Sequence, residues 1–242
     1  MIEEIEIKIW NQVAGYAAYR AGRLVHFEYE AKFPLIYDLA PLMMPRAAQQ
    51  AWSFDLNEAT YHGLPGLLAD SLPDKYGTQM IDLWFAKNGI ALGDVSALDR
   101  LCYLGSRAMG ALEFFPNHDS KFPDQNLDIE KLVDLSAQVL SERMNIKASL
   151  EDMATVLQVG SSAGGARAKA VIAFNPETRE IRSGQMNHCG FEDWIVKFDG
   201  ISNEAQGDPL GYTNIEYAYY LMARDSGIEM MDSCLYEENC RY

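Results

Sequence analysis

The stretch "VGSSAGGARAKAVIAF", from Val159 to Phe174, joins a glycine- and serine-rich segment to two cationic residues and an apolar run. Glycines let a backbone approach a phosphate closely, and consecutive N–H groups can then form a concave anion site. The stretch lacks the GK[ST] ending of a Walker A loop, and it does not fit the GxGxxG fingerprint. On its own it predicts either another kind of phosphate-binding loop or an ordinary turn between a helix and a strand.

The residues downstream of this stretch favour the phosphate loop. Lys197 lies in "WIVKFD", a predicted strand of mostly apolar residues, where a lysine is costly unless its ammonium meets an anion or a carboxylate. Glu216 lies in the next predicted helix, "NIEYAYYLMA". The chain therefore has a glycine-rich loop, a strand, a strand that carries a lysine, and a helix that carries a glutamate. These elements follow one another in the same order in the small lobe of a protein kinase. Two alternatives remain. Lys197 extends its ammonium to solvent at a strand edge, and Glu216 lies near a helix N-terminus only because a carboxylate is favourable there.

The first part of the chain has the pattern of a small β-rich subdomain with helices. Alternating residues over the first thirty positions predict two or three antiparallel strands with turns at the glycines. Apolar residues at helical spacing then predict helices within 64–72, 78–87 and 96–105, the second ending near Gly89. The segment "GALEFFPN" predicts a further strand. We assign residues 1–116 to this subdomain.

A polar segment with a proline, residues 117–128, is predicted to be a linker. Residues 129–242 then show a helix over 129–141, a capping-box spacing from Ser149 to Asp152, two strands, "AKAVIAFN" and "DWIVKFDG", and a helix that stops at Gly227. The predicted fold class is α+β, with the β-rich subdomain followed by a kinase-like small lobe over 129–242.

Composition limits the possible functions. The 242 residues carry a formal net charge of −15, which argues against direct nucleic-acid binding, because phosphate contacts need clustered Lys and Arg. No apolar run approaches the ~20 residues of a membrane helix, and the acidic, alternating N-terminus is unlike a signal peptide. The four cysteines form no CxxC pair, so we expect reduced thiols and no zinc site. These features predict a cytoplasmic protein with no membrane association.

Five motifs in the same order resemble the HipA family of serine/threonine kinases, the toxin half of toxin–antitoxin pairs. The resemblance covers essentially the whole chain. It is carried by "HGLPGLLADSLPDKYG", "LDRLCYLGSRAMGALEFFP", "GSSAGGARAKAVIAF", "WIVKFD" and "NIEYAYYLMARDSGIEM".

The resemblance implies ATP and magnesium as cofactors and gives the motif residues roles. The loop would cover the ATP phosphates, with Lys197 holding α/β-phosphate oxygens and Glu216 positioning that lysine. Ser162 matches the loop serine whose autophosphorylation shuts the kinase down, because a dianion in a phosphate loop competes with ATP. Ser161 is the neighbouring candidate for that modification. The loop residues implied to bind the cofactor are Ser161, Gly164, Gly165, Ala166 and Lys169.

The sequence also departs from the family pattern. The family's catalytic and magnesium-binding aspartates belong to a helical large lobe downstream, and no residue here is assigned to either role. Asp193, Asp199, Asp208 and Asp225 all fall in the small-lobe region. We therefore expect the helical large lobe to be absent from this chain, and the chain to be inactive by itself as a truncated product, a fragment or half of a split kinase.

The resemblance implies several partners. They are a HipB-like antitoxin, a chain that supplies the large lobe, and a protein substrate such as an aminoacyl-tRNA synthetase. Two alternatives to the kinase interpretation remain open. The chain is a non-catalytic module whose residues 1–116 dock an antitoxin-like partner protein and repress or regulate it, or it is a non-functional remnant with a structural loop. ATP affinity separates the kinase interpretation from both.

Overall fold

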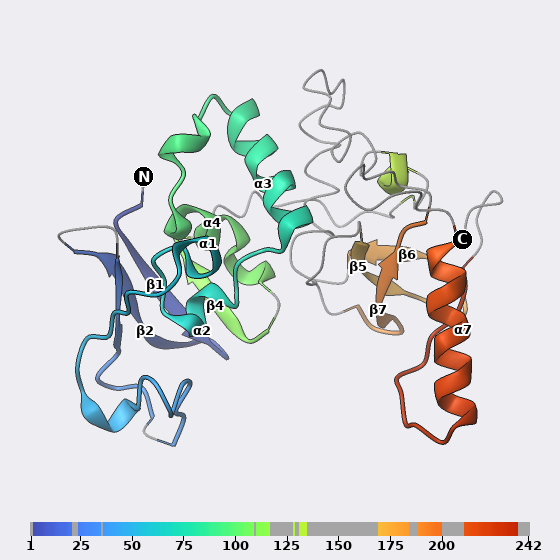
Figure 1. The fold of residues 1–242 in the computed structure, drawn as a ribbon, viewed down its shortest axis with the longest axis horizontal. Coiled ribbons are helices and arrows are strands. Elements are labelled where there is room, and N and C mark those ends of the chain that lie inside the picture. The colour runs from blue at the N-terminus through green and yellow to red at the C-terminus, as the bar shows by residue number, and fades with distance from the viewer. Residues whose placement is uncertain are drawn as a thin grey trace. The chain divides into compact units, whose positions relative to one another are not determined.

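The computed structural model describes residues 2–20, 24–34, 36–108, 110–116, 128, 131–134, 169–183, 188–199 and 211–236. The chain divides into two compact units, Met1–Phe122 and Pro123–Tyr242, and each is described by itself. The predicted α+β class is confirmed by two antiparallel sheets and several helices (Figure 1). No helix in the described ranges is both long enough and apolar enough to cross a membrane.

The first unit is built on a four-stranded antiparallel sheet of order β3-β2-β1-β4. The strands span Glu4–Ile9 (β1), Gln12–Tyr19 (β2), Val25–Tyr29 (β3) and Leu112–Phe115 (β4), which confirms the strands predicted here. The β1–β2 turn places Trp10 and Asn11 at φ +50° and +61°. Two positive φ values suit the twist of a tight hairpin. Successive side chains of a strand point to opposite faces, and alternate side chains of β1 are buried on one face of the sheet.

Helix α4 (Ala97–Leu104) and residues Leu64 and Leu68 pack into the core formed by this sheet, and further short helices belong to the same unit. Among the described residues of this unit, the α-helices are α1 (Glu58–Tyr61), α2 (Gly66–Ala69), α3 (Lys75–Lys87) and α4. The 3₁₀ turns in the same described residues are η1 (Arg46–Ala48), η2 (Leu92–Asp94) and η3 (Gly105–Arg107). The core includes Ile7, Phe27, Leu98, Leu101 and Phe114, all completely buried.

Two helix boundaries differ from the prediction. The helix expected within 64–72 is only the four-residue α2, because Pro65 sets its first turn and Pro73 follows closely. The helix expected from Thr78 begins earlier, at Lys75, because the Asp74 side chain accepts the N–H of Gly77 at 2.7 Å as an N-cap. Its end was predicted correctly, since Gly89 follows with φ +76°.

The second unit contains a three-stranded antiparallel sheet of order β6-β5-β7 and one long helix. Strands β5 (Lys169–Phe174) and β7 (Glu192–Lys197) and helix α7 (Tyr212–Asp225) confirm the predicted elements. Strand β6 (Ile181–Ser183) was not predicted, because three residues are too short to display a period. Residues 131–134 are helical, within the helix expected over 129–141, whereas Ser149 and Asp152 lie outside the described residues.

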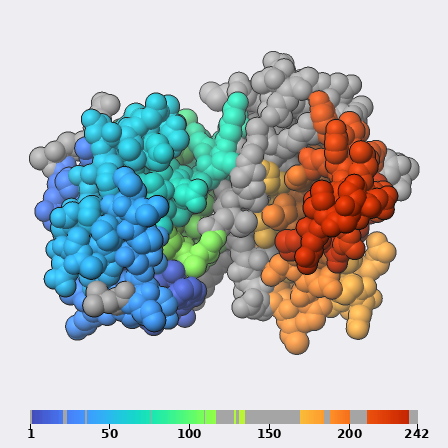
Figure 2. All heavy atoms as spheres, turned by 60° about the horizontal axis from the view of Figure 1, so that its bottom comes forward, coloured from blue at the N-terminus to red at the C-terminus, as the bar shows by residue number. Residues whose placement is uncertain are grey.

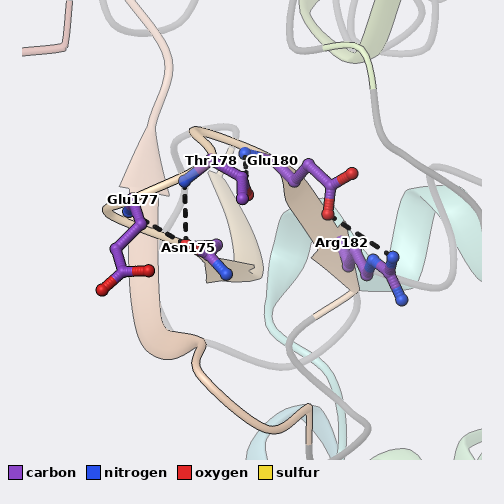
Figure 3. A network of polar contacts seen from close by, with 5 residues as sticks. All are labelled: Asn175, Glu177, Thr178, Glu180 and Arg182. Atoms are coloured by element: carbon purple, nitrogen blue, oxygen red, sulfur yellow. Dashed lines mark hydrogen bonds and ion pairs between the residues drawn. The ribbon is translucent and has the colours of Figure 1, made fainter.

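Polar contacts shape the turn between β5 and β6 (Figure 3). The side-chain oxygen of Asn175 accepts the N–H groups of Glu177 and Thr178 at 2.9 and 3.0 Å. Glu180 lies 3.5 Å from the guanidinium of Arg182. Such side-chain-to-backbone bonds favour a tight turn, which returns β6 along one edge of β5. The other edge of β5 is left for β7.

The predicted stop of α7 at Gly227 is confirmed. Gly227 has φ +78°, its N–H donates to Arg224 at 2.9 Å, and the N–H of Ile228 donates to Ala223 at 3.0 Å. These paired bonds form a Schellman motif, in which a glycine adopts the left-handed conformation without a steric cost.

Candidate functional site

Lys197 and Glu216 meet at the end of strand β7 and the second turn of helix α7. Lys197 Nζ lies 2.5 Å from Glu216 Oε2, and the two side chains are 49% and 46% exposed. The sequence predicts that an ammonium in this apolar strand needs an anionic partner, and the structure provides one. Among the described strands β7 nevertheless lies at one edge of the sheet, and Ile195 is half exposed, so the lysine is less desolvated than the apolar sequence implies.

Lys169, the first residue of β5, lies directly opposite Lys197 in the β5–β7 ladder. Residues directly opposite each other on antiparallel strands project from the same face of the sheet. Lys169 is only 3% exposed, in a strand whose Ala170 and Ile172 are also buried. The site therefore places two cationic residues opposite each other, and the carboxylate of Glu216 contacts one of them, Lys197.

A second contact connects the end of β7 to the start of α7. The N–H of Gly211, the N-cap residue of α7, donates to Asp199 Oδ2 at 2.8 Å. Gly211 has φ +86°, a conformation that favours glycine. Asp199 has no role in the sequence prediction, because no sequence signal connects an aspartate to a glycine twelve residues away.

The structure brings together three of the predicted site residues, Lys169, Lys197 and Glu216. The loop residues predicted to bind the nucleotide or to be phosphorylated lie outside the described residues: Ser161, Ser162, Gly164, Gly165 and Ala166. In the part of the chain that the structure describes, no three His, Cys, Asp or Glu side chains gather as ligands for a metal ion.

The comparisons with known proteins cover both units. Residues 5–115 match the family model for the HipA N-terminal domain, and residues 161–241 match the model for the HipA-like C-terminal domain. The chain belongs to the HipA family. The second match contains Lys169, Lys197 and Glu216, and at the family level it supports a HipA-like toxin kinase. A search of curated proteins found no match to this chain.

Proposed function

We propose that residues 129–242 are the nucleotide-binding part of a HipA-like, ATP-dependent serine/threonine kinase. Lys169 and Lys197 contact phosphate oxygens of ATP, and Glu216 orients Lys197. The observation that supports this proposal is the 2.5 Å contact between Lys197 Nζ and Glu216 Oε2, with Lys169 opposite Lys197 across the sheet.

The charges at this place favour an anionic ligand. Like charges directly opposite each other on neighbouring strands destabilise a sheet, and Lys169 lies opposite Lys197 in the β5–β7 ladder. A phosphate group beside Lys169 and Lys197 offsets their repulsion. An ammonium carries three N–H donors, so Lys197 can donate to Glu216 and to a phosphate oxygen at once. The contact with Glu216 also limits the rotamers of Lys197 before the ligand arrives, which reduces the cost of binding.

The glycine-rich loop directly precedes Lys169 in the chain. We propose that its backbone N–H groups, at Gly164, Gly165 and Ala166, and the hydroxyl of Ser161 contribute further phosphate contacts. Phosphorylation of Ser162 then adds a dianion among these donors and weakens ATP binding. Each of these roles follows the family pattern, and the loop lies outside the described residues.

Phosphoryl transfer needs a metal ion and a base on the acceptor hydroxyl, in addition to a nucleotide site. The described residues offer no cluster of metal ligands, so we assign no step through magnesium to them. We propose that these 242 residues bind ATP without transferring phosphate on their own. A HipB-like antitoxin, a chain that supplies the large lobe and a protein substrate, such as an aminoacyl-tRNA synthetase, are the partners proposed by family analogy, in the cytoplasm.

A second candidate function is a protein-docking module, and exposed side chains of the first unit favour it. Trp10, Ile36, Leu42 and Met43 are large apolar residues that face solvent, and Trp10 packs edge-on against Tyr37. Apolar side chains that adjoin one another at the surface, as Trp10 and Tyr37 do, are typical of protein-interaction surfaces when they belong to a contiguous patch. ATP affinity separates this function from the nucleotide site, because docking by the first unit needs no nucleotide.

Isothermal titration calorimetry with ATP, with and without magnesium, tests the proposal. We expect the unsubstituted chain to bind ATP, and Lys197→Ala to weaken binding by about ten- to a hundredfold, as loss of one charged phosphate contact implies. Lys32→Ala, at an exposed lysine of the first unit, is the matched control and leaves the affinity unchanged. A folded chain that binds no ATP, or a Lys197→Ala variant that binds normally, contradicts the proposal.

A further inference from the structure

We propose that Asp199 is a positioning residue for the Lys197–Glu216 pair, an inference that rests on the proposed function of that pair. Asp199 follows Lys197 by two positions, just beyond the end of β7. Its Oδ2 atom accepts the N–H of Gly211, immediately before α7, at 2.8 Å. One charged hydrogen bond thus joins the end of the lysine strand to the start of the glutamate helix.

Both ends of this connection have defined positions. On the strand side, Phe198 separates Lys197 from Asp199 and is buried, which holds the chain at this point. On the helix side, Gly211 is the N-cap, and Glu216 lies a little over one turn further along α7. An α-helix is a rigid element, so a displacement or rotation of its first residue moves Glu216 with it.

Buried side chains contribute little to holding α7 in its position. None of the side chains of Tyr212–Asp225 is buried, and the helix lies at the surface in Figure 2, where it is red. Ile215, Tyr219 and Met222 are each more than half exposed. A helix with so little buried apolar surface depends on polar contacts for its position. Asp199–Gly211 and Lys197–Glu216 are two such contacts, and they lie close together in the chain.

The second oxygen of Asp199 makes this carboxylate unusual. Oδ1 is buried and accepts no hydrogen bond from the described residues. A buried carboxylate oxygen without a donor reduces stability, so this side chain is not optimised for stability alone. An asparagine at position 199 keeps an oxygen for the Gly211 N–H and removes the charge, whereas an alanine removes the acceptor. These two substitutions therefore separate the hydrogen bond from the charge.

The test measures ATP affinity by calorimetry on the full chain, for Asp199→Ala, Asp199→Asn and the control Asp193→Ala. Asp193 is an exposed aspartate on the same strand. We expect Asp199→Ala to weaken ATP binding by about five- to tenfold, as loss of a charged hydrogen bond acting through Glu216 implies. Asp199→Asn should retain most of the ATP affinity of the unsubstituted chain, and Asp193→Ala should leave that affinity unchanged.

A second measurement separates positioning from general destabilisation. In a Glu216→Gln background, Asp199→Ala should add little to the loss of affinity, because both residues act through Lys197. Full additivity of the two substitutions, or equal effects of Asp199→Ala and Asp193→Ala, overturns the inference.

Hydrogen exchange of the first turn of α7 provides a readout that needs no nucleotide. If the unsubstituted chain binds no ATP, the proposed function is wrong, and this exchange decides the role of Asp199 in holding the helix. Faster exchange in Asp199→Ala than in Asp193→Ala supports that role. Unchanged exchange overturns it.

Discussion

The substitution Glu216→Gln separates two roles of the Lys197–Glu216 contact. Both side chains are about half exposed, at 49% and 46%. Ion pairs this exposed contribute roughly 0.2–1 kcal/mol to stability. Glutamine keeps the shape of the side chain and removes its charge, so we expect the free energy of unfolding to fall by less than about 1 kcal/mol. That corresponds to a shift in the melting temperature of at most about 2–4 °C.

The effect of Glu216→Gln on nucleotide affinity should be larger than its effect on stability. Glu216 acts by orienting Lys197, so we expect ATP binding to weaken by about three- to tenfold, less than in Lys197→Ala. In a Lys197→Ala background the same substitution should have almost no effect, because the group that it orients is gone. Glu229→Gln, at an exposed glutamate beyond the end of α7, is the control.

Thermal unfolding followed by circular dichroism, together with ATP calorimetry, gives both quantities on the same variants. The reasoning is refuted if Glu216→Gln lowers the melting temperature far beyond 4 °C while leaving ATP affinity unchanged, because the pair is then structural. It is also refuted if Glu216→Gln weakens ATP binding by the same factor in the otherwise unsubstituted chain and in the Lys197→Ala variant.

Three further predictions concern the folded core. Gly15→Ala should destabilise the first unit by about 1–3 kcal/mol in chemical denaturation, because a Cβ there would lie 2.3 Å from the carbonyl oxygen of Glu28. Unchanged stability would show that β2 and β3 can move apart to accommodate the methyl group without a cost. Asp99→Ala should lower the free energy of unfolding by about 1–3 kcal/mol in the same assay, because the Asp99 carboxylate accepts hydrogen bonds from the N–H groups of Ile2 and Ser96 and from the Ser96 hydroxyl. An unchanged free energy of unfolding would contradict a stabilising role for these hydrogen bonds. Burial, and secondarily the charge of Asp99, raises the pKa of Cys102 from 9.0 to about 12, so a thiol reagent at pH 8 should modify the exposed Cys189 and Cys234 and reach Cys102 only on unfolding. The unfolded thiol ionises first, so the contribution of Cys102 to stability should fall as pH rises from about 9 toward 12, and Cys102→Ala should remove that part of the pH dependence.

The elements with strong periodicity could be predicted from the sequence. The alternation in β1 and β2 and the helical spacing in α3 and α4 each reflect one buried face, so a local pattern is sufficient. The helical spacing of α7 also predicted its helix, although none of its side chains is buried. The stop signals at Gly89 and Gly227 are equally local, because a left-handed residue after a helix favours glycine.

The features that sequence analysis missed depend on contacts between distant residues or on very short segments. The capping box of Ser96 and Asp99 at the start of α4 is an exception, because its spacing of three residues is local and can be recognised in the sequence. Strand β6 is too short to show alternation, and without it the order β6-β5-β7 could not be inferred.

In the candidate site, too, some contacts could be predicted from the sequence and others could not. The pairing of Lys197 with Glu216 was predicted from motif order, because a lysine in an apolar strand needs an anion. The register that places Lys169 opposite Lys197 could not be predicted, since it depends on how three strands assemble. Asp199 was missed because its contact with Gly211 exists only once β7 and α7 are in position.

The central claim is that ATP phosphates bind beside Lys169 and Lys197. An acyl-phosphate derivative of ATP transfers its acyl group to a lysine amine that lies next to the bound phosphates, and mass spectrometry of the digested chain identifies the labelled lysine. The account predicts labelling at Lys197 or Lys169 that excess ATP blocks and that Lys32 does not share. Labelling spread over exposed lysines and unaffected by ATP would contradict it.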